Sequence, residues 1–345
     1  MSVDLTGGLG EEREFVFGEQ PKDPEMRESV NAWLWDGGTD VGLPRIGVEA
    51  VGDQWNSHEL QVNICTPDGR VFNAPPTGPV HPPLGADGRP RILGAGPLSF
   101  ELIEPYKHWK LRLDGDMVET TVGRQIAGEP PEGRTVAIQA EIDIRSAVPP
   151  FENGMLLESA KRVLDDQDEG ALMGGPRFEQ LSRATGALRI GEREYQIDGG
   201  ALRVRRQGIR RMGTFRGHAW QSALFPSGRA FGYIVYPPRD DGLATYNEGY
   251  LFEGDGALIA ATVRDAPWLR RLRPADEDVS VTLETAKGTT TIEGTSLFSN
   301  FRVLGGVGTT SDFPVLQQAI ARYTWEGETA NGMMERSTRG GQIER

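Results

Sequence analysis

Short runs of alternating apolar and polar residues, separated by glycine-containing turns, recur along most of this chain. Residues 58–65 and 136–142 show the alternation most plainly, and residues 66–69 (TPDG) form a turn after the first run. A period of two places successive side chains on opposite faces of a strand. The 45 glycines and the scarcity of leucine–alanine runs favour strands and turns over helices. The sequence therefore predicts an all-β protein built of antiparallel barrels or sandwiches.

One stretch has helical rather than strand-like spacing. Residues 155–164 place apolar side chains at positions 156, 160, 163 and 164, which is the pattern of an amphipathic helix. A chain of 345 residues is also more typical of two domains than of one. We therefore expect this short helix to connect two β domains. The expected divisions are a flexible lead-in at residues 1–24, an N-terminal β domain at 25–145, a connector with a helix at 146–185, a C-terminal β domain at 186–338 and a tail at 339–345.

Composition and charge restrict the partners and the location of the protein. The net charge is −13 and no face rich in lysine and arginine is apparent, so nucleic acid is not an expected partner. The single cysteine, Cys65, cannot form an internal disulfide. Residues 1–20 lack the basic start and apolar core of a signal peptide, and no run approaches the roughly 20 apolar residues of a membrane span. We expect a cytoplasmic protein without a membrane span and leave open whether it forms a homodimer.

Motifs for metals and coenzymes are absent from the sequence. The four histidines, at positions 58, 81, 108 and 218, are scattered and show no HxH or HExxH spacing. There is no GxSxG motif, no phosphate-binding loop, and no nicotinamide or flavin motif that leads from a strand into a helix. We therefore expect neither a metal nor a cofactor.

Residues 199–236 carry the densest group of candidate functional side chains. Arginines at positions 203, 205, 206, 210 and 211 precede His218 and Trp220. Arginine can bind a carboxylate or phosphate group of a ligand, and we select Arg203 and Arg210 as candidate substrate-binding residues. Because alternate residues of a strand point to opposite faces, at most about half of these arginines can converge on one pocket. Pairing with the many acidic residues is the competing interpretation.

Two short pairs suggest acid–base chemistry. His218 and Trp220 share one strand face, and Tyr246 and Glu248 share another by the same spacing of two. If the two strands are neighbours, Glu248 would protonate a ligand in a dry cavity, while Tyr246 and Trp220 would line a developing cation. His218 and Tyr246 complete the candidate catalytic set. The alternative is structural: Trp220 packs in the core, His218 is a hydrogen-bonded structural histidine, and Glu248 faces water.

Three further side chains complete the candidate site. Trp33 and Trp35 alternate with apolar residues in a strand candidate, which places both indoles on one face. Glu335 lies in an expected closing strand and would either reach the mouth of the second barrel or support Arg203 or Arg210. We list Trp33, Trp35, Trp220 and Glu335 with the two arginines as substrate-binding candidates.

Three stretches resemble the two-domain, lipocalin-like family that contains carotenoid 1,2-hydratases, AttH-like proteins and decalin-forming Diels-Alderases. They are residues 104–115, 197–210 and 332–337, whose order and spacing cover most of residues 25–338. Residues 203–210 keep the arginines and glycine of the family pattern Arg-Asp-His-x-Trp-Gly-x-Arg but lack its Asp, His and Trp. The resemblance implies two lipocalin-like β-barrel or sandwich domains and a hydrophobic ligand more firmly than it implies hydration.

The expected function follows from the resemblance and from the candidate residues. We expect a cofactor-independent, non-redox enzyme, either a lyase of the hydratase or dehydratase type or an isomerase or cyclase. Its substrate would be a hydrophobic, terpenoid- or polyketide-like molecule held in a β-barrel cavity or in a cavity between the two β domains. The alternative is a non-catalytic carrier of such a molecule, which the missing Asp, His and Trp favour. A third alternative is an interaction module, which would have no cavity and a large exposed apolar patch.

Overall fold

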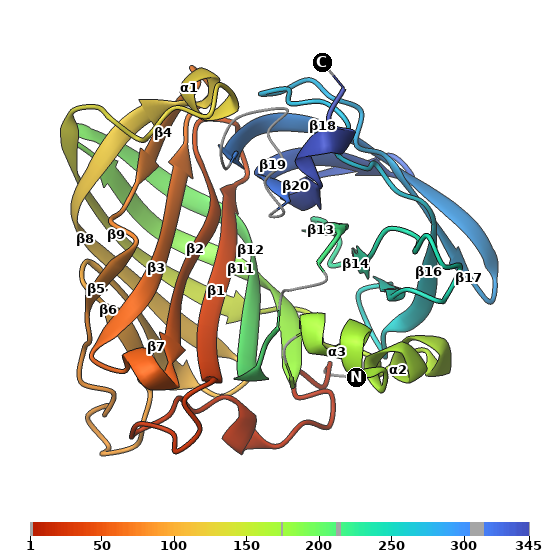
Figure 1. Ribbon diagram of the computed structural model, residues 1–345, viewed down its shortest axis with the longest axis horizontal. Coiled ribbons are helices and arrows are strands. Elements are labelled where there is room, and N and C mark those ends of the chain that lie inside the picture. The colour runs from red at the N-terminus through yellow and green to blue at the C-terminus, as the bar shows by residue number, and fades with distance from the viewer. Residues whose placement is uncertain (1–2, 174, 212–214, 304–313, 345) are drawn as a thin grey trace.

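Two closed barrels of antiparallel strands lie side by side in the computed structural model (Figure 1). The structure describes residues 3–173, 175–211, 215–303 and 314–344. Strands of the first barrel close in the order β11-β12-β1-β2-β3-β4-β8-β9, because β9 pairs with both β8 and β11. The second barrel closes from β13 to β20 in chain order, and β20 pairs with β13. The all-β, two-barrel architecture expected from the sequence is confirmed.

The strands of the first barrel are joined by hairpins and by two longer connections, at residues 74–107 and 147–176. They are β1 (Met26–Asp36), β2 (Gly42–Val51), β3 (Ser57–Cys65), β4 (Arg70–Asn73), β8 (His108–Thr121), β9 (Thr135–Ser146), β11 (Arg177–Ile190) and β12 (Arg193–Ile209). Four shorter strands extend the same sheet: β5 (Thr77–Pro79), β6 (Ile92–Ala95), β7 (Leu98–Glu104) and β10 (Phe151–Glu152).

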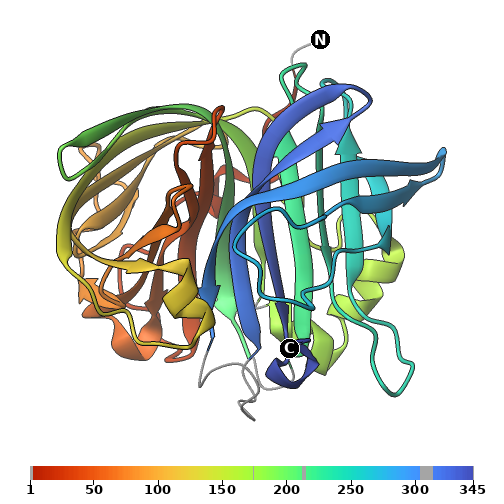
Figure 2. The same cartoon turned by 90° about the horizontal axis from the view of Figure 1, so that it is seen from above.

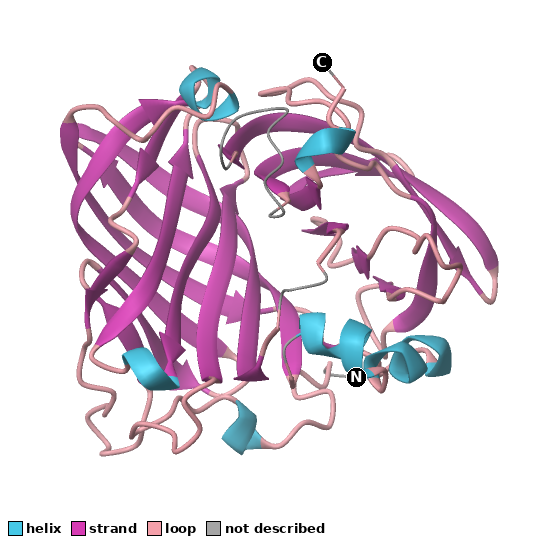
Figure 3. Ribbon diagram, viewed as in Figure 1, coloured by secondary structure: helices cyan, strands magenta, loops and turns pink. Residues whose placement is uncertain are grey.

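The second barrel is formed by consecutive antiparallel strands. They are β13 (Gly217–Leu224), β14 (Ala230–Val235), β15 (Asn247–Phe252), β16 (Ile259–Asp265), β17 (Val281–Thr285), β18 (Gly288–Arg302), β19 (Val315–Trp325) and β20 (Glu328–Thr338). Helices are few and short in the described parts of the chain (Figure 3). They are α1 (Val122–Ile126), α2 (Glu158–Leu164), α3 (Gln167–Met173) and three single turns, η1 (Glu11–Arg13), η2 (Gly52–Gln54) and η3 (Gly340–Gln342). None of the helices in these ranges is long and apolar enough to cross a membrane.

The hairpin of β11 and β12 belongs to the first barrel, which corrects the domain boundary predicted from the sequence. Strand β12 pairs with β1 from Met26↔Ile209 to Asp36↔Gly199, and β11 pairs with β9. The expected connector at 146–185 and C-terminal domain at 186–338 had separated this hairpin from the N-terminal strands. The expected helix is present as α2, but α2 and α3 lie in an excursion between β9 and β11. Alternation identifies a strand without revealing which sheet edge it joins.

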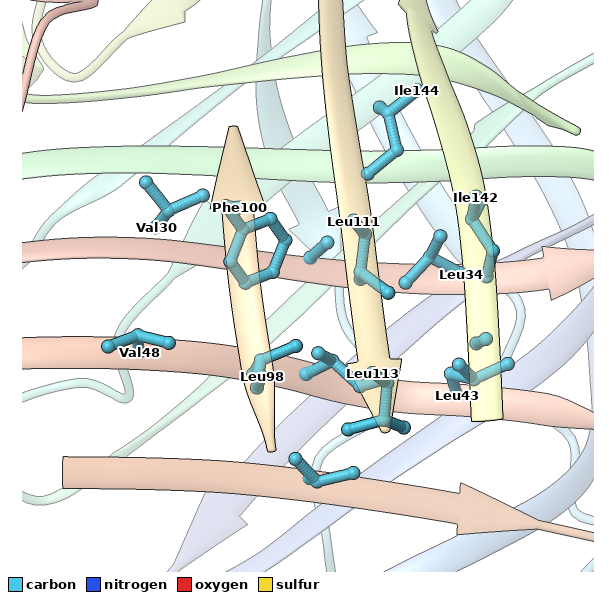
Figure 4. Packing of buried hydrophobic residues seen from close by; sticks show 14 of the residues in the cluster. Val30, Leu34, Leu43, Val48, Leu98, Phe100, Leu111, Leu113, Ile142 and Ile144 are labelled. Carbon is cyan, nitrogen blue, oxygen red and sulfur yellow. The ribbon is translucent and has the colours of Figure 1, made fainter. Parts of the chain in front are cut away.

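Apolar side chains occupy the interior of the first barrel (Figure 4). Val30 and Leu34 of β1 point inward toward residues such as Phe100. Trp33 and Trp35 share one face of β1, as their alternation in the sequence predicted; that face points outward and belongs to the apolar contact between the two barrels. A third apolar cluster occupies the interior of the second barrel. The sequence left open a cavity in or between the barrels, and the candidate cavity described below lies between them.

The N-terminal lead-in, expected to be flexible, packs against the first barrel through buried ion pairs. Glu14 accepts hydrogen bonds from Arg203 Nη2 at 2.7 Å and from Trp109 Nε1 at 2.6 Å. Arg203 and Glu14 are both fully buried, and Phe15 packs beside them in the apolar cluster of the barrel interior. The same inward face of β12 carries Arg205, which pairs with buried Glu28 at 2.9 Å. Glu14 and Arg203 lie 189 residues apart in the chain, so local sequence patterns gave no sign of their contact.

Candidate functional site

A small polar cavity lies where the outer faces of the two barrels meet. Figure 2 shows the barrels side by side, with β12 and β20 at the junction. The cavity has a volume of about 60 Å³ and is lined from both barrels. Its polar lining consists of Asn31, Arg45, Arg177, Arg206, Arg210, His218 and Glu335. Its aromatic lining consists of Trp33, Phe215, Trp220 and Tyr236. We call this the inter-barrel cavity.

A larger groove adjoins the inter-barrel cavity. The groove has a volume of about 490 Å³ and follows β2 and β3 to Arg302 of β18. Asn31 and Arg45 line both the cavity and the groove, so the two spaces meet at these side chains. The groove is of the size that holds a drug-sized molecule, whereas the cavity holds only one small group or one or two waters.

His218 and Glu335 form a hydrogen-bonded pair in the wall of the cavity. The register of β13 and β20 sets Trp220 opposite Glu335 and His218 opposite Ser337, so all four side chains emerge on one face. His218 Nε2 lies 3.2 Å from Glu335 Oε1, and Nδ1 lies 2.7 Å from Ser337 Oγ. The backbone N–H of His218 also donates to Ser337 Oγ. We assign the Ser337 hydroxyl as donor to Nδ1, which leaves Nε2–H to donate to Glu335.

Glu335 is held in its ionised form. Burial alone would raise the pKa of its carboxyl group, but hydrogen bonds from His218 and Gln318 and the charges of Arg45 and His218 lower it to about 2. Gln318 Nε2 donates to Glu335 Oε2 at 2.6 Å, while Gln318 Oε1 accepts from Asn63 Nδ2 at 2.8 Å. This amide connection runs from the second barrel to β3 of the first. A fixed carboxylate beside an imidazole is the arrangement that orients a histidine and stabilises its protonated form.

The indoles and two arginines form a stacked wall. The rings of Trp33 and Trp220 meet edge to face with centroids 4.6 Å apart. Arg45 lies over Trp33 at 5.4 Å, and Arg177 lies over Trp220 at 4.7 Å. Such contacts orient both the guanidinium groups and the rings. Trp33, Arg45 and Arg177 come from the first barrel and Trp220 from the second, so the wall depends on both barrels being in place.

Arg45 occupies its place through an unusual backbone conformation. Its φ is 108°, a region that residues other than glycine rarely adopt. It lies at an irregularity between β2 and β3 where the register shifts between Gly42 and Ile46. Arg45 Nε donates to Asn31 Oδ1 at 3.3 Å, and Nη1 lies 3.8 Å from Glu335 Oε2. Strained residues of this kind persist where the surrounding structure holds them, and they concentrate at functional sites.

Glu179 is a buried carboxyl group that the sequence analysis did not select. It lies directly behind Trp220, whose Nε1 is 3.4 Å from Glu179 Oε1, and it pairs with Arg177 at 2.9 Å. Burial raises the pKa of Glu179, and the charge and hydrogen bond of Arg177 only partly oppose this. The sequence signal was weak, because an Arg-x-Glu pair on a strand is equally typical of an exposed surface.

Five of the nine residues selected from the sequence line the inter-barrel cavity, namely Trp33, Arg210, His218, Trp220 and Glu335. Glu335 does not support Arg203 or Arg210 as expected; its partner is His218. The four that lie elsewhere are Trp35, Arg203, Tyr246 and Glu248. Trp35 packs in the barrel contact against Gly200, where any larger residue would collide with the indole.

Glu248 and Tyr246 belong to an anchoring contact instead. The sequence analysis considered that the strand of His218 and Trp220 could pair with the strand of Glu248. Strand β14 lies between these two strands, β13 and β15, so they are not neighbours. Fully buried Glu248 accepts backbone hydrogen bonds from Gly154, Leu156 and Leu157, at 2.6 to 2.9 Å, and one from Tyr246 Oη at 2.5 Å. These bonds fasten the start of α2 to the second barrel. A carboxylate whose lone pairs are all occupied in this way is a cap for a helix start.

Replacing Glu248 with glutamine is expected to destabilise the fold without touching the cavity. The amide group loses the charge and presents donors to backbone N–H groups, so we expect a loss of about 1–3 kcal/mol in the free energy of unfolding. Urea denaturation measures this loss. The control is Glu253→Gln in the same barrel, an exposed partner of Arg229, for which little change is expected. Equal stability of the two variants would contradict the anchoring role.

The chain matches one protein-family model and several solved structures. The model, described as "Domain of unknown function (DUF7064)", matches residues 18–339. A protein assigned as AttH from Nitrosomonas europaea is 14% identical, with a TM-score of 0.55 over 95% of this chain and 99% of that one. CghA in complex with Sch210972 is 13% identical, with a TM-score of 0.53 over 91% and 88%. Kievitone hydratase from Nectria haematococca is 10% identical, with a TM-score of 0.50 over 97% and 96%.

These likenesses bear on the fold. The matched structures cover almost the whole chain, and they confirm the lipocalin-like two-barrel fold that the resemblance in residues 104–115, 197–210 and 332–337 implied. A search of curated proteins gives no match.

Proposed function

Since the chain belongs to the DUF7064 family and shares the two-barrel fold of AttH, CghA and kievitone hydratase, we propose that it is a cofactor-independent, non-redox enzyme. The reaction class is hydration or dehydration, isomerisation or ring closure of a hydrophobic, terpenoid- or polyketide-like molecule. One of the similar structures is named a hydratase, and another was solved with the small molecule Sch210972. The absence of nucleotide and flavin motifs from the sequence agrees with chemistry by side chains alone.

The observation that carries the proposal is the His218–Glu335 pair inside the inter-barrel cavity. Hydration, dehydration, double-bond isomerisation and ring closure through a cation require a proton to be given to or taken from carbon or oxygen, whereas a concerted ring closure needs none and would use the cavity only for positioning. His218 would perform the proton transfer at Nδ1, where a substrate or water oxygen would replace the Ser337 hydroxyl, while ionised Glu335 at Nε2 stabilises the imidazolium form. The indoles of Trp33 and Trp220 would pack against the apolar body of the substrate beside the reacting atoms.

The sizes of the two adjoining spaces suggest how a substrate would lie. The cavity of about 60 Å³ admits only the end of a molecule, whereas the groove of about 490 Å³ can hold its body. The reacting end would therefore pass between Asn31 and Arg45 to reach His218. Of the two locations expected from the sequence, inside a barrel or between the two, this arrangement corresponds to the second, because the reacting groups come from two barrels.

The test is a mass-resolved activity screen. Purified protein is incubated with a library of terpenoid and polyketide-like compounds, and products are followed by liquid chromatography with mass spectrometry. A gain of one water identifies hydration, a loss of one water dehydration, and a new product of unchanged mass isomerisation or cyclisation. Compounds that are retained by the protein but never altered, even in heavy water, would instead support the carrier that the departure at residues 203–210 favours.

A further inference from the structure

We infer that the arginines of the inter-barrel cavity form a receptor for the carboxylate group of the ligand, which makes the ligand class an amphipathic organic acid with a flat apolar body. The inference rests on the proposed function in placing the ligand in this cavity, and it adds the charge and polarity of that ligand. It is carried by the way in which Arg206 is buried.

Arg206 is buried without the partners that its neighbours have. It is 8% exposed and faces the cavity, and among the described residues its Nε has no hydrogen-bond partner. Arg205, the next residue along β12, points to the opposite face and pairs with Glu28 at 2.9 Å. Arg203 pairs in the same way with Glu14. The strand thus gives each of these inner-face arginines a carboxylate partner, although Arg203 Nε and Nη1 and Arg205 Nε are also unpartnered among the described residues, whereas Arg206 is directed into the cavity without a carboxylate.

Cations outnumber anions around the cavity. Four guanidinium groups line it, together with a single carboxylate, that of Glu335, in a protein whose net charge is −13. Glu335 is already bound to His218 and Gln318. Within the described part of the chain, neither Arg206 nor Arg210 forms an ion pair. A buried group of like charges is costly unless an anion joins it.

The pKa directions agree with this geometry. Burial lowers the pKa of Arg206 well below its ordinary value, and the charges of Arg210 and Arg177 lower it further. Burial likewise lowers the pKa of Arg210. The carboxylate of Glu49 acts in the opposite direction on both, but its Oε1 is bound to Arg27 at 2.6 Å. Burial and the neighbouring guanidinium groups together therefore disfavour the charged form of Arg206 more than Glu49 favours it.

The arginines around Arg206 are fixed in place rather than free to swing away. Arg177 is held by Asn153 and Glu179, both at 2.9 Å. Arg210 Nε donates to the carbonyl of Leu172 at 2.9 Å. Arg45 is held by its bulged backbone and by Asn31. Groups oriented in advance bind an anion without losing side-chain entropy, and guanidinium forks match the two oxygens of a carboxylate.

The walls of the cavity indicate what is attached to the carboxylate. Trp33, Trp220, Phe215 and Tyr236 surround the cations, and aromatic rings of this kind favour a planar aromatic or conjugated body. A carboxylate near Arg206 with a conjugated body beside the indoles would place the reacting atoms next to His218. The substrate class would then be an aromatic or polyene acid rather than a neutral hydrocarbon.

Paired ligands of equal shape provide the test. trans-Cinnamate, whose carboxylate stands at the end of a narrow, flat body, and its uncharged amide are titrated into wild-type protein, and binding is followed by tryptophan fluorescence and by the shift in melting temperature. We expect the acid to bind at least about tenfold more tightly than the amide, and Arg206→Met to abolish that preference. Arg211→Met removes an equal charge from the exposed pair with Glu25 and should leave the preference unchanged.

A ligand-free measurement supplies a second test of the same inference. Arg206→Met should raise the melting temperature of the protein without ligand, because it removes one of several repelling buried cations. Arg205→Met should lower it, because Glu28 loses its partner. Equal affinity for acid and amide, or a loss of stability in Arg206→Met that matches Arg205→Met, would overturn the inference. If the protein prefers the acid but converts no compound, the carboxylate receptor stands and the proposed enzymatic function is wrong. If the protein converts only neutral compounds, the enzymatic function stands and the carboxylate receptor is wrong.

Discussion

Replacing His218 with asparagine is expected to reduce kcat by a factor of about 100 to 10,000 while the protein remains folded. Asparagine keeps a polar atom near the position of Nδ1, within reach of Ser337, but it cannot carry a proton at neutral pH. The measurement is steady-state turnover of whichever compound the mass-resolved screen identifies. Because His218 is one of many residues that line the cavity, we expect binding of the ligand to change much less than kcat.

The matched control for this variant is His108→Asn. His108 also forms a hydrogen bond to a carboxylate, 2.6 Å from Asp143, but on the first barrel and outside the cavity. It should leave kcat unchanged. Glu335→Gln should lower kcat in the same direction as His218→Asn, because the imidazolium loses its stabilising charge. Full activity in His218→Asn would remove the proposed proton transfer and, with it, the catalytic assignment of the cavity.

Replacing Glu14 with glutamine is expected to lower the free energy of unfolding by about 3–5 kcal/mol. The change leaves the guanidinium group of Arg203 fully buried and without its carboxylate. It also turns an amide donor toward Arg203 or Trp109, each of which already donates to Glu14. Equilibrium denaturation by urea, followed by tryptophan fluorescence, measures the loss.

Two comparisons make the Glu14 result specific. Glu11→Gln, three residues away, removes a charge from the exposed pair with Arg89 and should change stability by less than about 1 kcal/mol. The double variant Glu14→Gln with Arg203→Met should recover much of the lost stability, since no buried charge is then left unpaired. If Glu14→Gln were as stable as Glu11→Gln, the lead-in would not contribute to the closure of the barrel.

Local patterns in the sequence predicted the elements of this fold well. The alternation of Val30 and Leu34 with Trp33 and Trp35 correctly separated the inward face of β1 from the outward one. Hydrophobic periodicity depends only on neighbouring residues, so it can be read directly from the chain. Partners distant in the chain were not accessible in this way. The pairing of β1 with β12 and the contact of Glu14 with Arg203 each join segments about 180 residues apart.

The candidate site was predicted in part, for the same physical reason. His218, Trp220 and Glu335 were selected because of their residue types, and the register of β13 with β20 brings them together. Glu248 was assigned a catalytic role that the structure replaces with an anchoring one, since its backbone donors come from a segment over 90 residues earlier. Arg45 was not selected, because nothing in a local pattern reveals a strained turn in a bulged strand.

The late position of β12 in the chain has a consequence during synthesis. When a ribosome has delivered the residues up to β9, the edges of β1 and β9 still await β12 and β11. Such open edges readily pair with other chains. The arginines that receive Glu14 and Glu28 also emerge only near residue 203. The N-terminal half of the nascent chain therefore cannot complete its barrel before β12 is synthesised. The yield of folded protein would depend on a chaperone that protects this half until residue 209 has left the ribosomal exit tunnel.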